Sequence, residues 1–467
     1  MTQTSWPAIS IDRTGPVPVF EQICAAIRAR ASTGDLPEGT AVPPTRVLAV
    51  ELGVSRSTVV IAYEQLVAEG YLRARQGSGH VVCAMGEVEA APAAARPRPA
   101  RAEASPPSAR PFVAGTPDMR LFPYRQWART VARLCRSNPQ AMFTTTDAFG
   151  NLALRGAIAA HLRDWRGVVA APEQIIITAG ATDALELCMR SLSRTGETIA
   201  LEDPGYAPLR SFARAQGLRP VFLPLDEQGA TLPPPVETPR LAVLTPSHQY
   251  PLGGAMSPSR RSAWAHWARS GDAWIVEDDY DSEFRYAGRP IPAMAGFDPL
   301  SRTIYVGSFS KIFSNALRLG YLIVPEPLLG AFRQTVLRFG VRAGSMPQQA
   351  LAEFMSSGEF YRHLRRVRRI YGERRRFLLD RLARDFAEFG SATDHQAGMQ
   401  TVLHLRPDLD DAALAERARA AGLTVSALSR YCAVPGRGNG LILGFCAFSE
   451  VEMAPALDAL RDLLANA

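Results

Sequence analysis

One low-complexity stretch divides this chain into two parts that have to fold separately. Residues 87–111 read EVEAAPAAARPRPARAEASPPSARP, and Val88 is the only aromatic or branched aliphatic residue among them. Such a segment cannot bury a core, and its alanine, proline and arginine content is typical of a semi-extended, solvated linker. We therefore predict a small N-terminal domain over 12–85, a flexible linker over 86–112 and a large domain over 113–467.

Composition narrows the class of protein. The chain has 467 residues, 47% hydrophobic and 21% charged, which fits a globular protein with at least one large core. No apolar run approaches the roughly 20 residues that span a bilayer, and MTQTSWPAIS lacks the features of a secretory signal. The six cysteines are scattered, which predicts thiols in a reducing cytosol and neither a disulfide frame nor a zinc site. We expect a cytoplasmic protein without a membrane partner, and the net charge of +7 permits a nucleic-acid partner.

The N-terminal domain has the pattern helix, helix, helix, hairpin, which makes it α+β. VFEQICAAIRARASTG has helical spacing and stops at Gly34. Thr45 is predicted to cap a short helix, and Ser55 to cap the next one after a tight turn at Gly53. Two helices joined in this way form a helix-turn-helix. GYLRARQGSGHVVC then predicts a two-stranded hairpin or wing around Gly77-Ser78-Gly79.

A helix-turn-helix places the first residues of its second helix in the major groove of DNA. Residues 1–85 hold seven arginines and seven acidic residues, so a neutral domain for protein contacts is the alternative. The arginines from 46 onward gather around the turn and the wing, however, which favours DNA binding. Arg73, near the wing, also flanks the second helix. The predicted DNA contacts are Arg46, Ser55, Arg56, Ser57, Thr58, Arg75 and Ser78. The segment PEGTAVPPTRVLAVELGVSRSTVVIAYEQLVAEGYLRARQGSGHVV resembles the winged-helix head of GntR-type bacterial repressors and activators, over nearly all of 15–83.

The large domain alternates strand and helix patterns. QIIITAG, TIALEDPGY, RLAVLTPSH, AWIVEDDYD and RTIYVGSFS are short strands rich in branched aliphatic residues, several of them followed by helical stretches. This alternation predicts an α/β domain whose mainly parallel sheet is covered on both faces. From about residue 340 the pattern changes to a long helix and a smaller α+β unit. The arginine run over 362–376 lies on that helix. Most such runs form solvated faces, and a supplementary DNA contact is the alternative.

Lys311 is the only lysine among 52 cationic side chains. A neutral primary amine condenses with an aldehyde to give an imine, whereas a guanidinium does not deprotonate and is a weak nucleophile. A leftover surface lysine is the alternative. The surroundings favour chemistry, because Ser308, Ser310 and Arg318 offer two hydroxyls and a permanent cation suited to a phosphate.

Three further stretches fit pyridoxal 5'-phosphate as the aldehyde. Gly180, Ala181 and Thr182 lie where a strand enters a helix, a place where backbone N–H groups bind phosphate, although it also fits an ordinary turn. Asp278 and Tyr280 share one face of a strand and suit a pyridine nitrogen and a ring oxygen, or else an N-cap and a packed tyrosine. Tyr206, after a Pro-Gly turn, could stack on a flat ring or belong to the core.

Taken together, these stretches resemble fold type I pyridoxal-phosphate-dependent transferases over about 113–467. The complete arrangement resembles the MocR/GabR subgroup of GntR-type regulators. By that resemblance Lys311 holds the internal aldimine, Asp278 contacts the pyridine nitrogen, Tyr280 the ring oxygen, and Tyr206 stacks. Ser308, Ser310 and Arg318 then serve the phosphate. The resemblance also implies a homodimer in which the head of one chain packs on the body of its partner.

The chain departs from the aminotransferase pattern at three positions. Tyr250 stands before Pro251, where these enzymes usually have an asparagine that touches the cofactor, and His248 or Gln249 is a candidate substitute. The late strand LILGFCAF lacks the arginine that grips a substrate carboxylate, and Arg430 is the candidate effector anchor in its place, or else a solvated loop cation. In regulators that bind 4-aminobutyrate an arginine lies two residues after the stacking tyrosine. In this chain that position is Pro208, and the nearest arginine, Arg210, lies two residues further on. We therefore do not predict 4-aminobutyrate as the effector.

The sequence therefore predicts a regulator that binds operator DNA and senses pyridoxal phosphate, an amino compound, or both. The rivals are an aminotransferase with an accessory DNA-docking head and a scaffold without a cofactor. The effector, the operator and the direction of regulation are not determined by the sequence.

Overall fold

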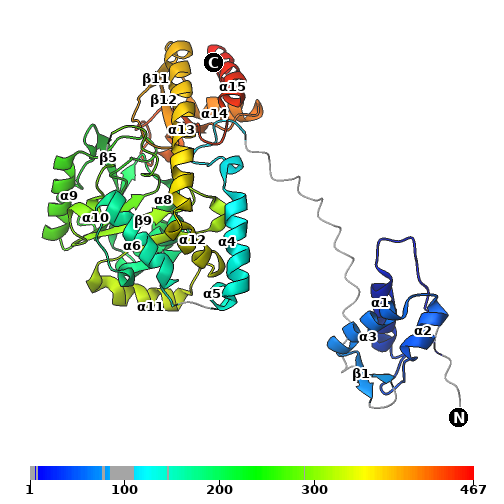
Figure 1. Ribbon diagram of the computed structural model, residues 1–467. Helices are drawn as coiled ribbons and strands as arrows, with labels where there is room; N and C mark the ends of the chain where they lie inside the picture. The colour runs from blue at the N-terminus through cyan, green and yellow to red at the C-terminus, as the bar shows by residue number, and fades with distance from the viewer. Residues whose placement is uncertain (1–5, 7–8, 76–78, 85–109, 145–146, 289) are drawn as a thin grey trace. The chain divides into compact units, whose positions relative to one another are not determined.

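The computed structural model describes residues 6, 9–75, 79–84, 110–144, 147–288 and 290–467 (Figure 1). The chain divides into two compact units, Met1–Pro106 and Pro107–Ala467, which are described separately and called the head and the body. In the described residues, no helix combines the length and the apolar character needed to cross a membrane.

The head is a three-helix unit with a hairpin. Its helices are α1 (Val19–Thr33), α2 (Thr45–Leu52) and α3 (Arg56–Ala68), and strands β1 (Leu72–Arg75) and β2 (Gly79–Val82) pair antiparallel. Ile23 and Ile27 of α1, Leu48 of α2 and Val59 and Leu66 of α3 are fully buried against one another. Gly34 ends α1 with a left-handed φ of 84°, and Gly53 forms the turn between α2 and α3 with a φ of 61°. These are the helix-turn-helix and wing predicted from the sequence.

The predicted cap at Thr45 is wrong by one residue. Helix α2 begins at Thr45 itself, and Pro44 occupies the N-cap position with a φ of −55° and a ψ of 142°. The φ that proline fixes also suits a helix, but the ψ of Pro44 is extended, so the helix starts immediately after this residue. Ser55 does cap α3, because its side chain accepts a hydrogen bond from the backbone N–H of Thr58 at 3.1 Å.

The body is built on an eight-stranded sheet with the order β3-β10-β9-β8-β7-β4-β5-β6. Strands β4, β5, β7, β8 and β9 run parallel, whereas β10 is antiparallel to both of its neighbours and β6 is antiparallel to β5. The strands are β3 (Ile175–Thr178), β4 (Thr198–Asp203), β5 (Arg219–Asp226), β6 (Gly229–Ala230), β7 (Leu241–Leu244), β8 (Trp274–Asp279), β9 (Thr303–Ser308) and β10 (Gly320–Ile323).

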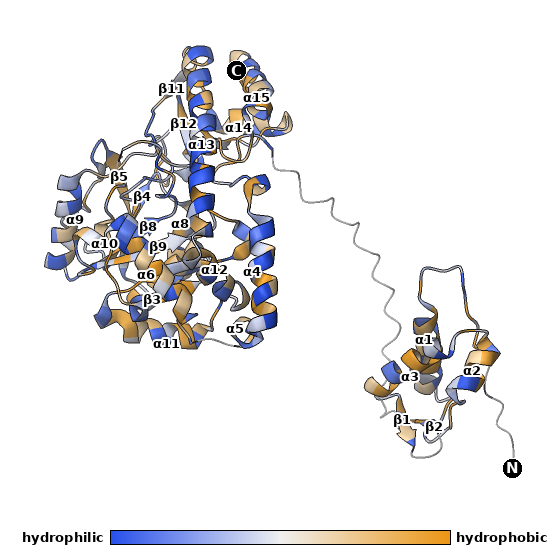
Figure 2. Ribbon diagram, viewed as in Figure 1, coloured by the Kyte–Doolittle hydropathy of each residue, from blue (hydrophilic) through white to orange (hydrophobic). Residues whose placement is uncertain are grey.

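Helices cover both faces of this sheet, as predicted. Ile175 and Ile177 of β3 pack into one core with α6 and α12, while Ile176 between them packs into a second core with α7 and α11. Figure 2 shows apolar strands inside and polar outer helix faces. The helices are α4 (Tyr124–Ser137), α5 (Pro139–Phe143), α6 (Leu152–Arg166), α7 (Ala181–Leu192), α8 (Ala207–Ala215), α9 (Pro258–Ser270), α10 (Met294–Phe297), α11 (Leu329–Phe339) and α12 (Met346–Ser356). Short 3-10 turns lie at Met119–Leu121, Pro172–Gln174, Asn315–Leu317, Glu326–Leu328 and Leu428–Tyr431.

A smaller α+β subdomain follows the long helix α13 (Glu359–Asp385). Its four-stranded antiparallel sheet has the order β11-β12-β14-β13, with α14 (Asp411–Ala420) and α15 (Glu450–Ala465) beside it. The strands are β11 (Gly390–Ala392), β12 (Gln400–Leu405), β13 (Ser426–Ala427) and β14 (Gly440–Gly444). The first residues of the body join this sheet, because the N–H of Gly444 donates to the carbonyl of the buried Phe112 at 2.9 Å.

Candidate functional site

The predicted DNA contacts of the head lie together at the start of α3 and around it. Ser55, Arg56 and Ser57 are exposed there, and the hydroxyls of Ser57 and Thr58 lie 2.8 Å and 2.7 Å from that of Ser55. Exposed Arg46 lies in the first turn of α2, and exposed Arg75 is the last residue of β1. Ser78 lies outside the described residues.

A cavity of about 340 Å³ lies in the body at the ends of strands β3, β8 and β9. The structure gathers there every cofactor-site residue predicted from the sequence, together with four that were not predicted for it: Ala179, Leu185, Tyr250 and Asn315. The predicted residues that line the cavity are Gly180, Ala181, Thr182, Tyr206, Asp278, Tyr280, Ser308, Ser310, Lys311 and Arg318.

One end of the cavity has the chemistry of a phosphate site. Gly180 caps α7 with a φ of 97°, so the free N–H groups of the first turn of α7 begin at the cavity wall. The N–H of Ser310 donates to the hydroxyl of Ser308 at 3.1 Å, which holds the loop after β9 in place. Arg318 lines the cavity from a left-handed backbone position (φ 49°), rare for a residue with a side chain.

The cavity also holds the buried carboxyl of Asp278 and the half-buried amine of Lys311. Asp278, on β8, is only 7% exposed, and its Oδ1 atom is buried without a hydrogen-bond partner. Burial, with the nearby charge of Asp279 adding to it, raises the pKa of Asp278 to about 7. Nζ of Lys311 donates to the carbonyl oxygen of Gly115 at 2.7 Å, and burial lowers the pKa of this amine against the pull of Asp281 and Asp278. A lower pKa favours the neutral, nucleophilic amine.

Behind Tyr280, a buried histidine fixes the phenol. The Tyr280 hydroxyl lies 2.9 Å from Nδ1 of His248, and the same nitrogen lies 3.0 Å from the carboxylate of Asp281. His248 therefore supports Tyr280 from outside the cavity, and Tyr250 lines the cavity at the position where aminotransferases have asparagine. Gln249 donates to the carbonyl of Pro204 at 3.0 Å.

The unpaired carboxyl of Asp278 predicts a pH-dependent gain in stability for Asp278→Asn. A carboxyl whose folded pKa lies near 7, above its ordinary value of 3.8, costs the folded protein stability as the pH rises from about 4 to about 7. The asparagine variant, dialysed free of small molecules, should therefore unfold at higher urea than the wild type at about pH 8. The advantage should shrink towards about pH 5. An advantage that is equal at both pH values would contradict the burial argument.

The predicted effector residue Arg430 has other partners in this structure. Its guanidinium forms an ion pair with Glu416, and its carbonyl oxygen accepts a hydrogen bond from Arg210 at 2.9 Å. Pro208 and Arg210 line a separate hollow of about 510 Å³.

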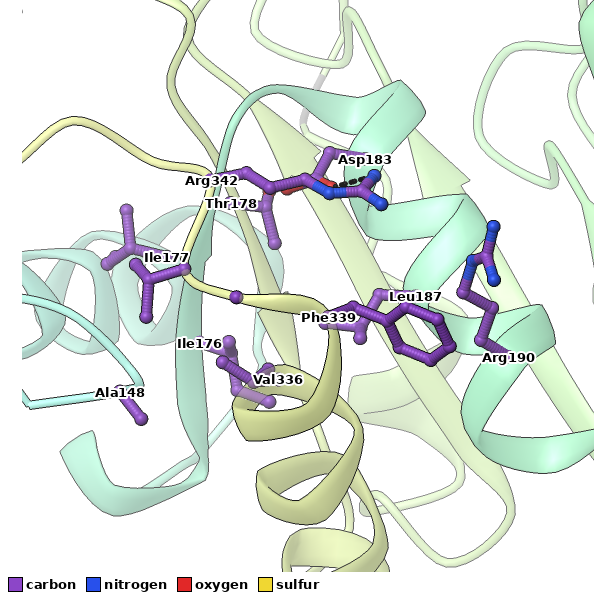
Figure 3. A pocket seen from close by; sticks show the side chains of 12 residues that line it. Ala148, Ile176, Ile177, Thr178, Asp183, Leu187, Arg190, Val336, Phe339 and Arg342 are labelled. Atoms are coloured by element: carbon purple, nitrogen blue, oxygen red, sulfur yellow. Dashed lines mark hydrogen bonds and ion pairs between the residues drawn. The ribbon is translucent and has the colours of Figure 1, made fainter.

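A second void, shown in Figure 3, is too small for a ligand. It lies beside α7 and the end of α11 and has a volume of about 30 Å³, which leaves room for about one water molecule. Apolar side chains such as Ile176 and Val336 line it, and Arg342 closes one side through its ion pair with Asp183 at 3.0 Å.

Comparison with known proteins agrees with this division of the chain. Residues 20–82 match the bacterial regulatory proteins of the gntR family, and residues 115–460 match the aminotransferases of class I and II. The chain is 37% identical to the probable rhizopine catabolism regulatory protein MocR of Rhizobium meliloti, with 97% of this chain and 94% of that protein aligned. The chain belongs to the MocR/GabR subgroup of GntR-type transcriptional regulators.

Other MocR-type relatives and solved aminotransferases show the same two similarities. The pyridoxine biosynthesis regulator PdxR of Corynebacterium glutamicum is 34% identical over 98% of this chain and 97% of its own length. An archaeal alanine:glyoxylate aminotransferase superposes with a TM-score of 0.71 and 25% identity, over 76% of this chain and 90% of that one. An α-aminoadipate aminotransferase of Thermus thermophilus, solved with N-(5'-phosphopyridoxyl)-L-leucine, has a TM-score of 0.68 and 26% identity over 76% and 92%. This MocR-type chain is thus a transcriptional regulator with a winged-helix head and an aminotransferase-like body.

Proposed function

We propose that this regulator binds pyridoxal 5'-phosphate in the 340 Å³ cavity and senses it, an amino compound, or both, through Lys311. The supporting observation is that the cavity brings the half-buried amine of Lys311 together with a buried carboxyl oxygen, Oδ1 of Asp278, that has no partner. A pyridine N–H is a fitting partner for that oxygen, and the phosphate fits the N-terminus of α7 with Ser308, Ser310 and Arg318. Tyr206 would stack on the ring and Tyr280 would bind its phenolic oxygen. When bound, the cofactor supplies an aldehyde that reacts with primary amines.

The chain's own residues prepare this site before any ligand arrives. Gly115 holds the amine of Lys311 at a fixed place, and His248 with Asp281 holds the phenol of Tyr280. Tyr206, Tyr250 and Tyr280 form an aromatic wall in which neighbouring ring centres lie 6.0 Å and 5.5 Å apart. Such a wall excludes water and suits a flat ring.

The rival function, steady transamination, has less support. The strand that carries the substrate-binding arginine in aminotransferases is LILG in β14, and Arg430 is paired with Glu416. Neither of these two positions therefore offers an unpaired cation to a substrate carboxylate. We propose a cytoplasmic, head-to-tail homodimer in which cofactor binding changes the spacing of the two heads on operator DNA.

The test is DNA binding with and without pyridoxal phosphate. Full-length protein should retain a duplex from upstream of its own gene in preference to a mixed-sequence duplex, and added pyridoxal phosphate should change the affinity or the footprint. A change of fivefold or more corresponds to roughly 1 kcal/mol of coupling. Steady turnover of an amino donor and a keto acid, together with equal affinity for both duplexes, would favour the enzyme instead.

A further inference from the structure

A groove of about 640 Å³ on the body collects six arginines. Most of them come from α13, which is strongly hydrophilic (Figure 2). Arg285 comes from a loop whose backbone pairs with a second loop. In this pairing Arg285 forms a β-bridge with Ala397, and the N–H of Tyr286 donates to the carbonyl of Gln396 at 2.9 Å. We call this surface the basic groove. Its charged residues are Arg285, Arg365, Arg368, Arg369, Arg375, Arg376, Glu373 and Asp394.

The two acidic residues of the basic groove are already used. Glu373 pairs with Arg369 at 3.2 Å, and Asp394 pairs with the buried Arg375. In the described parts of the chain, no carboxylate forms an ion pair with the remaining four arginines, which are Arg285, Arg365, Arg368 and Arg376.

The hydrogen bonds that Arg368 and Arg376 donate go to neutral carbonyl groups. Arg368 donates to the carbonyl of Arg285 and lies over the ring of Trp165, and burial lowers the pKa of Arg368 against the pull of Tyr286 and Glu283. Nε of Arg285 is buried without a hydrogen-bond partner. Arg376 donates only to the carbonyl of Gly372 in its own helix, at 3.5 Å. Like charges repel when they are gathered in a hollow, so this arrangement is stabilised when an anion binds there.

The charge distribution of the chain points to DNA as that anion. Residues 1–85, which include the predicted DNA-reading helix, carry seven arginines and seven acidic residues, whereas the whole chain carries +7. Protein–DNA affinity depends strongly on the number of phosphates that are neutralised. A head without net charge therefore leaves much of this electrostatic affinity to be supplied by the rest of the chain. Along α13, Arg365 and Arg376 are separated by eleven residues, or about 16 Å of helix. That length exceeds a single phosphate and suits several consecutive ones.

We propose that the basic groove binds the sugar-phosphate backbone of duplex DNA and supplies a sequence-independent part of the regulator's affinity. The proposal does not depend on pyridoxal phosphate, because the groove and the 340 Å³ cavity have no lining residue in common.

The test uses the full chain and a charge-matched pair of double variants. Arg365→Gln with Arg376→Gln removes two exposed arginines of the basic groove. Arg362→Gln with Arg366→Gln removes two exposed arginines of the same helix that do not line it. Binding of a fluorescent, mixed-sequence duplex of about 40 base pairs is measured between about 50 and 200 mM salt. The groove variant should reduce the slope of log K against log salt by about 1.8 and weaken binding about 30-fold near 0.15 M, whereas the control variant should change little.

Two further measurements keep the result interpretable. Arg365→Lys with Arg376→Lys should retain most of the slope, because a lysine also neutralises a phosphate, and thermal melts should match across all variants. Equal losses in the groove and control variants would reduce the effect to net charge and overturn the proposal. Unchanged DNA binding would overturn it as well. So would a groove variant that loses affinity for inorganic pyrophosphate alone, since the groove would then be a small-anion site.

Discussion

Lys311→Arg is expected to abolish the covalent retention of pyridoxal phosphate while the head still binds DNA. The substitution places a permanent cation beside Asp278 and the carbonyl of Gly115, and it removes the ability to deprotonate and attack an aldehyde. Wild-type protein mixed with pyridoxal phosphate, reduced with borohydride and digested should carry one cofactor mass on the peptide that contains residue 311, because Lys311 is the only lysine. The variant should carry none. The DNA response to pyridoxal phosphate should be lost with it.

The control for this experiment separates covalent attachment from binding. Arg318→Gln removes a cation from the cavity lining but leaves the amine of Lys311 in place. It should weaken cofactor affinity tenfold or more, in line with a charge-assisted hydrogen bond of about 1.5–3 kcal/mol, yet still give the reduced adduct at high cofactor concentration. A reduced adduct mapped to a side chain of the Lys311→Arg protein would show that Lys311 is not the attachment point.

Arg166→Met is expected to cost the body about 3–5 kcal/mol of stability. Arg166 at the end of α6 and Asp279 at the end of β8 are both only 5% exposed, and Nε of Arg166 donates to the Asp279 carboxylate at 2.8 Å. Methionine removes the cationic partner of that carboxylate, leaving its charge with only the hydroxyls of Ser282 and Tyr305 as hydrogen-bond donors among the side chains described here. Glu277 is buried on the same strand, and its pKa is raised by burial and by Asp279, so the remaining negative charges would also repel each other.

Urea unfolding followed by tryptophan fluorescence reports this loss, since five of the six tryptophans lie in the body. The matched control is Arg163→Met, one turn earlier on α6, which breaks an exposed ion pair with Asp164. That change should cost less than about 1 kcal/mol because solvent screens the pair. Similar losses for the two variants would contradict the assignment of the effect to the buried charge pair.

Much of the site was predictable because its residues lie in short local patterns. The turn at Gly180 lies between a strand and a helix, and Asp278 with Tyr280 lies at a strand end, so each pattern was visible in a few letters. Lys311 was visible through composition. The alternation of strands and helices predicted the parallel core of the sheet but not the antiparallel direction of β10. That direction depends on how the loop between Ser308 and Gly320, which carries Lys311, folds back.

The remaining features arise from contacts between residues that are distant in the sequence. Gly115 accepts from Lys311 across 196 positions, and no local pattern marks it. The position of Tyr250 in the cavity and of His248 behind it depends on how β7 and β8 lie side by side. The arginine run of α13 was predicted as a helix face, but its role as one wall of a groove required the loop at Arg285 to be in place.

The enclosed amine of Lys311 makes the chain a selective target for chemical labelling. Among its side chains, an acylating reagent that reacts with primary amines finds one group, and that group lies inside a cavity of about 340 Å³. Any compound that fills the cavity would shield it. The mass that a brief pulse of reagent adds to the peptide containing Lys311 therefore measures the fraction of unoccupied sites, and candidate effectors can be ranked in this way without an engineered tag.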